Sequence, residues 1–262
     1  MLGRGPEREG LDMSQLKTAV AVATSAGILI SGCAHNDGGG TASSSTTATT
    51  TSPKGPLTKD QLANLMLSPT ELDAALGVTG TYSDPPKTAL VEDPVKRSDY
   101  TVPPECNYAI RAALAPVYAD SGNTAVYGYH DVAPTPPGAT KMESPDVDQF
   151  VVLFPSPDQA SAFFTASSQG WPACANRQDT VPAEGGQPEL QWKVGPVANT
   201  DGVLRAAVTV TVMGSGGNVT MPCQRALTVR NNVVIDVDAC RKDVGDLGVT
   251  IANQIADKIG KP

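Results

Sequence analysis

The chain has 262 residues, and its 27 acidic side chains outnumber its 19 basic ones, which gives a formal net charge of −8 at pH 7. A surface of this sign repels the phosphates of nucleic acids and of anionic lipids. The composition therefore argues against a nucleic-acid partner and against an electrostatic hold on a membrane. Hydrophobic residues make up 40% of the sequence, which is enough for a single domain of about 200 residues with its own core.

The N-terminal segment has the layout of a secretory signal. We take Met13 as the true start, because a short basic segment and then the apolar segment Thr18–Ile30 follow it. The apolar segment is shorter than the roughly 20 residues of a membrane span, which favours a signal peptide over residues 1–32. The residues before Cys33, Ile30-Ser31-Gly32, resemble a bacterial lipobox.

In lipobox signals, cleavage precedes the cysteine and the thiol carries a diacylglycerol. We therefore expect a lipoprotein with lipid on Cys33, held by that lipid at the extracytoplasmic face of the cell membrane. The alternative is an ordinary signal peptide in which Cys33 has no such role.

A flexible linker is predicted over residues 33–56. Its segment Gly38–Ser52 contains only Gly, Ser, Thr and Ala, which cannot bury enough apolar surface to fold. As a coil it would span about 25 Å on average. One domain is predicted over residues 57–262, and no apolar run within it is long enough to cross a bilayer.

The predicted domain has helical patterns in both halves and strands between them. Ser68-Pro69-Thr70-Glu71 is a capping box with Pro at the first helical position, and Gly77 ends that helix. Ser156-Pro157-Asp158-Gln159 opens a second helix in the same way. The predicted helices are Lys59–Met66, Ser68–Gly77, Asn107–Ala119, Ser156–Ser168 and Val244–Ile259; in the last, Leu247, Ile251, Ile255 and Ile259 share one face.

The C-terminal half is rich in β-branched residues and short turns, a layout typical of an antiparallel meander. The predicted strands are Ala125–Val132, Val147–Phe154, Glu189–Val194, Val203–Met213, Cys223–Arg230 and Val233–Cys240. Together with the helices they predict an α+β fold, a largely antiparallel sheet with helices packed on it.

The last two strands predict a hairpin with Asn231-Asn232 as its two-residue loop. Asn tolerates the positive φ that a type I′ turn needs. Facing residues then have numbers that sum to 463, so Cys223 lies opposite Cys240 at a distance suited to a disulfide. The same register pairs Arg225 with Asp238. The alternatives are two unrelated thiols, or a bulge at Pro222 that shifts the register.

Four cysteines lie in the predicted domain, and four cysteines allow three pairings. If the hairpin fixes Cys223–Cys240, the remaining pair is Cys106–Cys174. We therefore expect two disulfides and an oxidising compartment. A zinc site is not expected, because the histidines and cysteines lack suitable spacing.

The sequence shows no pattern of a catalytic or cofactor site. His130 is the only histidine in residues 57–262, and no nucleophile elbow, phosphate loop or dinucleotide fingerprint occurs. Asp236 and Asp238 would share one hairpin face with Arg225, where a solvated or salt-bridged sheet face is a simpler interpretation than acid–base chemistry. We expect no enzyme, no cofactor and no metal.

Six side chains are candidates for a ligand cleft, although aromatic residues of this kind are commonly part of a core. They are Tyr127, Tyr129, His130, Trp171, Trp192 and Arg225.

Three motifs resemble one known family. They are Pro104-Glu105-Cys106 before a helix, Trp171-Pro172-Ala173-Cys174 after a helix, and Cys223-Gln224-Arg225-Ala226 with Cys240 further on. In these the chain resembles the PknH-like extracellular sensor domain over about Leu57–Ile259. That domain forms the outer part of a mycobacterial receptor Ser/Thr kinase and also occurs in free-standing lipoproteins.

The resemblance implies two disulfides and an α+β fold with a cleft for an unidentified ligand. We expect the lipoprotein form, without the kinase domain or membrane helix of the receptor, as a monomer whose domain binds a small molecule or envelope component. The alternatives are a module that docks another envelope protein, and an envelope hydrolase or transferase using His130 or the Asp236/Asp238 pair. A deep cleft lined by aromatic residues favours the ligand binder.

Overall fold

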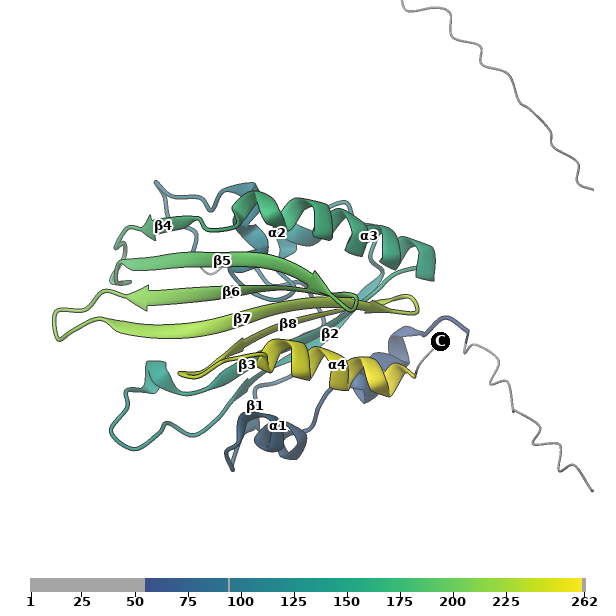
Figure 1. Cartoon of the computed structure of the whole chain (residues 1–262), viewed down its shortest axis with the longest axis horizontal. Helices are drawn as coiled ribbons and strands as arrows, with labels where there is room; N and C mark the ends of the chain where they lie inside the picture. Colours follow the sequence, from purple (N-terminus) through teal and green to yellow (C-terminus); the bar gives the residue numbers. More distant parts are fainter. Residues whose placement is uncertain (1–54, 94, 261–262) are drawn as a thin grey trace, which may run out of the picture. The chain divides into compact units, whose positions relative to one another are not determined.

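The computed structural model describes residues 55–93 and 95–260, which form an α+β domain (Figure 1). Eight strands make one antiparallel sheet in the order β1-β2-β3-β8-β7-β6-β5-β4. The predicted fold class is confirmed. The predicted signal peptide, Cys33 and all but the last two residues of the predicted linker lie outside the described residues.

Two groups of strands meet at the centre of the sheet. β1 to β3 follow one another in space as they do along the chain, β4 to β8 form a meander, and β3 pairs with β8. The strands are β1 (Tyr82–Ser83), β2 (Ala125–Val132), β3 (Asp146–Leu153), β4 (Gln178–Val181), β5 (Leu190–Thr200), β6 (Val203–Val212), β7 (Val219–Arg230) and β8 (Val233–Cys240). The short edge strands β1 and β4 were not predicted.

Helices cover both faces of the sheet (Figure 1). On the α4 face lie η1 (Lys59–Leu65, a 3-10 helix), α1 (Pro69–Leu76) and α4 (Leu247–Ile259). On the α3 face lie η2 (Pro104–Ala109), α2 (Ala115–Tyr118), α3 (Pro157–Gly170) and η4 (Trp171–Cys174), while η3 (Lys141–Glu143) lies in the loop between β2 and β3.

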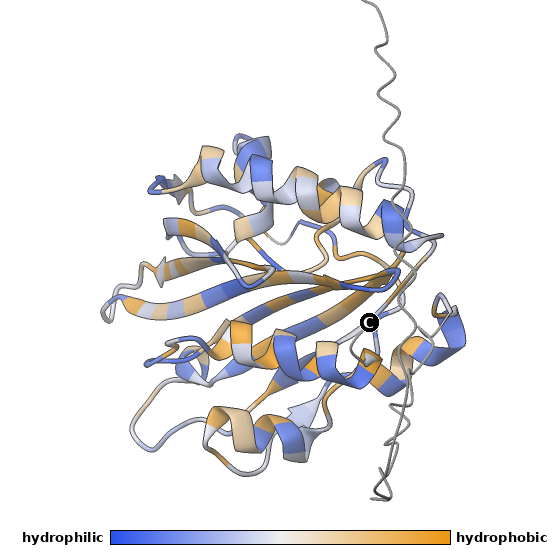
Figure 2. Cartoon of the chain, turned by 45° about the vertical axis from the view of Figure 1, so that its right-hand side comes forward, coloured by the Kyte–Doolittle hydropathy of each residue, from blue (hydrophilic) through white to orange (hydrophobic). Residues whose placement is uncertain are grey.

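Both faces of the sheet carry apolar side chains that pack under the helices on each side. Side chains alternate across a strand, so in β8 Val234 packs on the α3 face while Val233 and Ile235 pack on the α4 face. Figure 2 shows apolar residues along the strands between the two helical layers. Gly248 lets α4 lie directly on β7, because a Cβ there would come within 2.7 Å of the Gln224 carbonyl oxygen.

The predicted helix signals are confirmed where they depend on local residues. Ser68 accepts a hydrogen bond from the Glu71 backbone N–H, the Glu71 carboxylate accepts one from Ser68, and Gly77 ends α1 with a φ of 69°. Ser156 caps α3 through the Gln159 N–H. The predicted apolar face of α4, from Leu247 to Ile259, is buried.

The predicted hairpin register is confirmed. Cys223 faces Cys240 and Arg225 faces Asp238, and Pro222 pairs in register with Thr209 of β6, so no bulge shifts the strands. The turn differs from type I′, because Asn231 alone has a positive φ, of 53°. The reason lies in the Asn232 side chain, which is buried and bonds to Leu57 and Phe154.

The prediction of one continuous helix over Asn107–Ala119 is wrong. The 3-10 helix η2 ends at Ala109, and the chain bends at Ala113, whose φ is 53°, before the short helix α2. The bend has a tertiary cause: the Asp236 carboxylate, on β8, accepts a hydrogen bond from the Ala113 N–H at 2.8 Å. A continuous helix would need that N–H for its own ladder.

Both predicted disulfides are present. Cys106–Cys174 joins η2 to η4 with the Cα atoms 5.1 Å apart, and Cys223–Cys240 joins β7 to β8 with the Cα atoms 4.0 Å apart. Within residues 55–93 and 95–260, no helix has both the length and the apolar character needed to cross a membrane.

Candidate functional site

The α3 face carries an open groove of about 500 Å³ between η2, α2 and the C-terminal part of α3 with η4. Its lining is mostly apolar, and Glu105 is the one charged residue among the described residues that line it. The lining includes Pro104, Tyr108, Pro116, Val117, Phe163, Ala166 and Trp171. A second hollow of about 440 Å³ between α1 and α4 is polar by comparison, with Glu71, Asp257 and Lys258 in its lining.

One wall of the groove is an aromatic pair. The rings of Tyr108 and Trp171 are stacked, with centroids 4.1 Å apart and planes 8° apart. The Tyr108 hydroxyl donates a hydrogen bond to the Trp171 carbonyl oxygen at 3.0 Å, and the disulfide Cys106–Cys174 ties the two segments together. This wall is therefore fixed by a covalent bond, a hydrogen bond and ring stacking.

Buried Arg225 supports this wall from the sheet. Its side chain is 1% exposed, and its Nε donates to the Tyr108 carbonyl oxygen at 2.7 Å. The guanidinium carbon lies 6.0 Å from the centre of the Trp171 ring, within the range of a cation–π contact. The same guanidinium donates to the Val237 carbonyl oxygen and to Asp236.

Asp236 is linked to the groove through the buried residue Tyr118. One carboxylate oxygen is paired with Arg225; the other accepts from the Ala113 N–H and from the Tyr118 hydroxyl at 2.9 Å. The Tyr118 ring is stacked on Phe163 of α3, with centroids 4.6 Å apart. The buried ion pair Arg225–Asp236 thus contacts the groove residue Tyr108 directly and the groove residue Phe163 through Tyr118.

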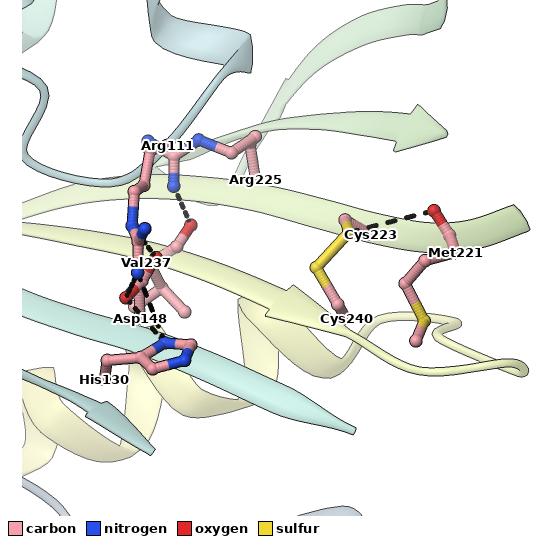
Figure 3. Close-up of a disulfide and its surroundings, with 8 residues drawn as sticks. All are labelled: Arg111, His130, Asp148, Met221, Cys223, Arg225, Val237 and Cys240. Atoms are coloured by element: carbon pink, nitrogen blue, oxygen red, sulfur yellow. Dashed lines mark hydrogen bonds and ion pairs between the residues drawn. A yellow bond between two sulfur atoms is a disulfide. The ribbon is translucent and has the colours of Figure 1, made fainter. Parts of the chain in front are cut away.

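Arg225 of this ion pair is also one end of a row of ionisable groups that crosses four strands. His130 of β2, Asp148 of β3, Asp238 of β8 and Arg225 of β7 face one another in register. Arg111, from the segment after η2, binds Asp148 through two hydrogen bonds of 2.6 and 2.9 Å. Figure 3 shows Arg111 and His130 converging on Asp148, beside the Cys223–Cys240 disulfide.

Burial, neighbouring charges and hydrogen bonds together set the pKa values of the groups in this row. Loss of solvation raises the pKa of Asp238 to about 7, and that of Asp146, next to the row on β3, to about 6. Burial also acts to raise the pKa of Asp148, but the hydrogen bond with His130 and the charge of Arg111 outweigh it and hold that pKa below its usual value. The hydrogen bond with Asp148 raises the pKa of His130.

The expected cross-strand charge pair is only partly correct. Arg225 faces Asp238 in register, but it forms its ion pair with Asp236, its diagonal neighbour. The interpretation of a salt-bridged sheet face holds for Asp236. The surface is not solvated, because the side chains of Arg225 and Asp236 are almost completely buried.

The structure does not bring the six predicted cleft residues together. Trp171 lines the groove, Arg225 lies behind it, and His130 is at the far end of the charged row. Trp192 is in the core of the α3 face, where its indole N–H donates to the Tyr100 hydroxyl. Tyr127 and Tyr129 pack on the α4 face. That any of them binds a ligand stays a prediction.

Sequence reasoning missed the residues that give the groove its shape. Tyr108 and Phe163 line it and Tyr118 packs against Phe163; the three come from separate segments, and their local pattern is that of ordinary core aromatics. Asp146 and Asp148 did carry a signal: they alternate at the start of a strand that ends in Phe150-Val151-Val152-Leu153, which marks charged groups facing a covered side of the sheet.

The site has few groups for covalent or metal chemistry. Within the described residues, one set of His, Cys, Asp or Glu ligand atoms lies close enough to share a metal ion, namely Cys223, Asp238 and Cys240. Its two thiols form a disulfide, which leaves one carboxylate. The groove itself offers shape, apolar surface and aromatic rings, which serve binding.

Two disulfides in a domain of this size are typical of proteins that fold in an oxidising compartment. The fold and its two disulfides are those of an extracellular-type α+β domain. The chain belongs to the family described as the PknH-like extracellular domain, whose profile matches residues 57–258.

The relatives found by sequence similarity are kinases that are much longer than this chain. Over 209 residues the chain is 32% identical to the serine/threonine-protein kinase PknH of Mycobacterium bovis, an alignment that covers 80% of this chain and 32% of the kinase. The kinase of the same name from Mycobacterium tuberculosis is 32% identical over 209 residues, 80% of this chain and 31% of the kinase. The chain thus spans about a third of the length of these relatives.

A solved structure identifies which part of the kinase is matched. The crystal structure of the extracellular domain of PknH from Mycobacterium tuberculosis has 31% sequence identity and a TM-score of 0.65 to this chain. The match covers 79% of this chain and 98% of that chain. The shared region is an extracellular, sensor-type domain and not the catalytic domain of the kinase.

Proposed function

We propose that this chain is an extracytoplasmic lipoprotein whose domain binds the apolar part of a small molecule or envelope component in the groove on the α3 face. The observation that carries the proposal is the groove itself. It is mostly apolar and its lining includes aromatic rings; a disulfide fixes the Tyr108–Trp171 wall, and a buried ion pair lies behind the groove. Preformed apolar clefts with few polar groups are the usual form of small-molecule sites.

The size and polarity of the groove define the class of ligand. A volume of about 500 Å³ lies within the range of roughly 300–1,000 Å³ found for small-molecule sites. The one charged residue of the lining, Glu105, is already paired with Arg177 at 2.9 Å. The groove therefore suits an uncharged aromatic or aliphatic group and not a phosphate or a sugar acid.

The groove is tested by an uncharged apolar fluorophore, N-phenyl-1-naphthylamine, added to the full-length chain. Ala166 is an exposed groove residue on α3, so Ala166→Arg places a long charged side chain in the groove without disturbing the core. We expect this variant to lose most of the probe fluorescence of the wild type. The matched control is Ala162→Arg: Ala162 is also exposed on α3 but does not line the groove, and helix side chains lean toward the N-terminus, away from it.

The two tryptophans locate the probe. Trp171 lines the groove and Trp192 does not. Quenching of tryptophan emission by the bound probe should persist in Trp192→Phe and be largely lost in Trp171→Phe. Equal probe binding by Ala166→Arg and wild type would contradict the proposal. Release of the probe by a co-purified envelope protein, and not by extracted envelope lipids, would favour the docking module instead.

The lipid anchor has its own test. If Cys33 carries the lipid, the wild-type protein expressed in a bacterial host should partition into the detergent phase of Triton X-114, and Cys33→Ala should move it to the aqueous phase. Mass spectrometry of the N-terminal peptide should show diacylglycerol on Cys33. A wild-type protein recovered in the aqueous phase, or one that begins at another residue, would rule out the lipoprotein form.

A further inference from the structure

Asp238 is the one carboxylate of the charged row whose bonding is incomplete. It lies directly opposite Arg225 in the hairpin register, yet the guanidinium pairs with Asp236 instead. Its Oδ1 is buried and makes no hydrogen bond within the described part of the chain. A buried carboxylate oxygen without a partner is costly when charged, so this position favours the protonated acid.

The charged neighbours of Asp238 lie on β2, β3, β7 and β8 and on the segment after η2. Arg225 faces it from β7, Asp146 and Asp148 lie on β3, and Arg111 comes from the segment after η2. Asp236 is two residues away on the same strand, His130 ends the row on β2, and the Cys223–Cys240 sulfurs lie within 4.8 Å of its carboxylate. Burial is the largest cause of the raised pKa of Asp238; the charges of Asp148 and Asp146 also raise it, and Arg225 and Arg111 lower it.

The groove depends on the same arginine. Arg225 holds the Tyr108 carbonyl oxygen at 2.7 Å and lies over the Trp171 ring. When Asp238 is protonated, Asp236 is the only charged partner on β8 that competes for Arg225. When Asp238 loses its proton, a second carboxylate opposite Arg225 attracts the guanidinium toward β8 and away from the aromatic wall.

We propose that proton binding at Asp238 regulates the groove: the protonated acid leaves Arg225 in place behind the Tyr108–Trp171 wall, and the carboxylate draws it away and weakens ligand binding. This inference rests on the proposed function, because it concerns the regulation of the same groove. It assigns to the domain a response to the acidity of its surroundings.

The direction in which pH changes ligand binding follows from the protonation state of Asp238. The pKa of Asp238 is raised by burial to about 7, so the acid is mostly protonated at pH 5.5 and mostly ionised at pH 8.5. Binding should therefore be tightest at acidic pH and weaken as the pH rises through 7. A coupling between two sites is commonly worth about fivefold or more in affinity, which is the loss we expect between pH 5.5 and 8.5.

The experiment measures the dissociation constant of N-phenyl-1-naphthylamine for the full-length chain from pH 5.5 to 8.5. The probe is uncharged over this range, so its own protonation does not contribute. Asp238→Asn, which imitates the protonated acid, should keep the tight acidic affinity at every pH. His130→Gln removes the imidazole at the end of the charged row and should leave the pH dependence in place.

Asp146→Asn is the sharper control. The charge of Asp146 raises the pKa of Asp238, so its removal should move the midpoint of the binding curve to lower pH without flattening it. A flat curve for the wild type, or a curve that His130→Gln abolishes, would overturn the inference. Probe binding that is insensitive to Ala166→Arg would instead overturn the proposed function, so the two failures are distinct.

A measurement on the wild type covers the case in which Asp238→Asn does not fold. Linkage is reciprocal, so a ligand that prefers the protonated acid must lower the acid dissociation constant of Asp238 by the same factor, which raises its pKa. The ¹³Cγ resonance of Asp238 in aspartate-labelled protein should therefore titrate at higher pH when the probe is bound. An unchanged titration midpoint would contradict the coupling.

Discussion

Replacing Arg225 with methionine should lower the free energy of unfolding by about 3–5 kcal/mol, because removal of one partner of a buried ion pair leaves the other charge uncompensated. Asp236 is 2% exposed, so water cannot replace the lost guanidinium. The substitution also removes the donor that holds the Tyr108 carbonyl oxygen. Equilibrium unfolding in guanidinium chloride, followed by circular dichroism, gives the value.

The matched control is an arginine–carboxylate ion pair on the surface. Arg177 pairs with Glu105 at 2.9 Å, but their side chains are 40% and 39% exposed. Exposed pairs contribute about 0–1 kcal/mol, so Arg177→Met should change the unfolding free energy by no more than that. Equal losses for Arg177→Met and Arg225→Met would show that the Arg225–Asp236 pair is solvated and does not hold the groove walls.

A double substitution separates the cost of the unpaired charge from the worth of the pair. Arg225→Met with Asp236→Leu removes both charges and should recover part of the loss, because buried pairs replaced by apolar groups are often close to neutral. The recovery should stay incomplete, since Asp236 also accepts hydrogen bonds from the Ala113 N–H and the Tyr118 hydroxyl. Those two donors would be left without an acceptor.

The sequence predicts best what neighbouring residues decide. The turn at Asn231-Asn232 and the alternation on either side set the register that pairs Cys223 with Cys240. Ser68 and Gly77 mark the two ends of α1 because capping is a contact within one turn of helix. In each case a turn or a helix cap of a few neighbouring residues decides the outcome, so the local pattern is sufficient to predict it.

Prediction from the sequence fails where the conformation of a residue depends on a partner far away along the chain. Ala113 adopts a positive φ because Asp236, 123 residues later, accepts its N–H, and no local pattern in Asn107–Ala119 reports that contact. The groove has the same origin, since its walls come from η2, α2, α3 and η4. Trp171 was identified as a candidate, but its partner Tyr108 becomes visible only when the Cys106–Cys174 bridge brings the two segments together.

The two disulfides should differ in their contribution to stability. Cys106–Cys174 spans 68 residues and Cys223–Cys240 spans 17. In the chain-entropy account, the longer loop is worth about 4 kcal/mol and the shorter about 3, because closing a longer loop removes more freedom from the unfolded chain. The β7 and β8 strands are also held by their hydrogen-bond ladder, whereas η2 and η4 have no ladder between them.

We therefore expect Cys106→Ala with Cys174→Ala to lower the unfolding free energy more than Cys223→Ala with Cys240→Ala. The first pair of substitutions should also weaken N-phenyl-1-naphthylamine binding in the groove, because that bridge fixes the Tyr108–Trp171 wall. The second pair serves as the control, since all four cysteines are buried and each variant loses two sulfur atoms. Equilibrium unfolding in guanidinium chloride gives the unfolding free energy of both variants, and titration with the probe gives their affinity for it. A larger loss of stability from the hairpin pair, or equal loss of probe binding in both, would show that the bridge between η2 and η4 does not organise the groove.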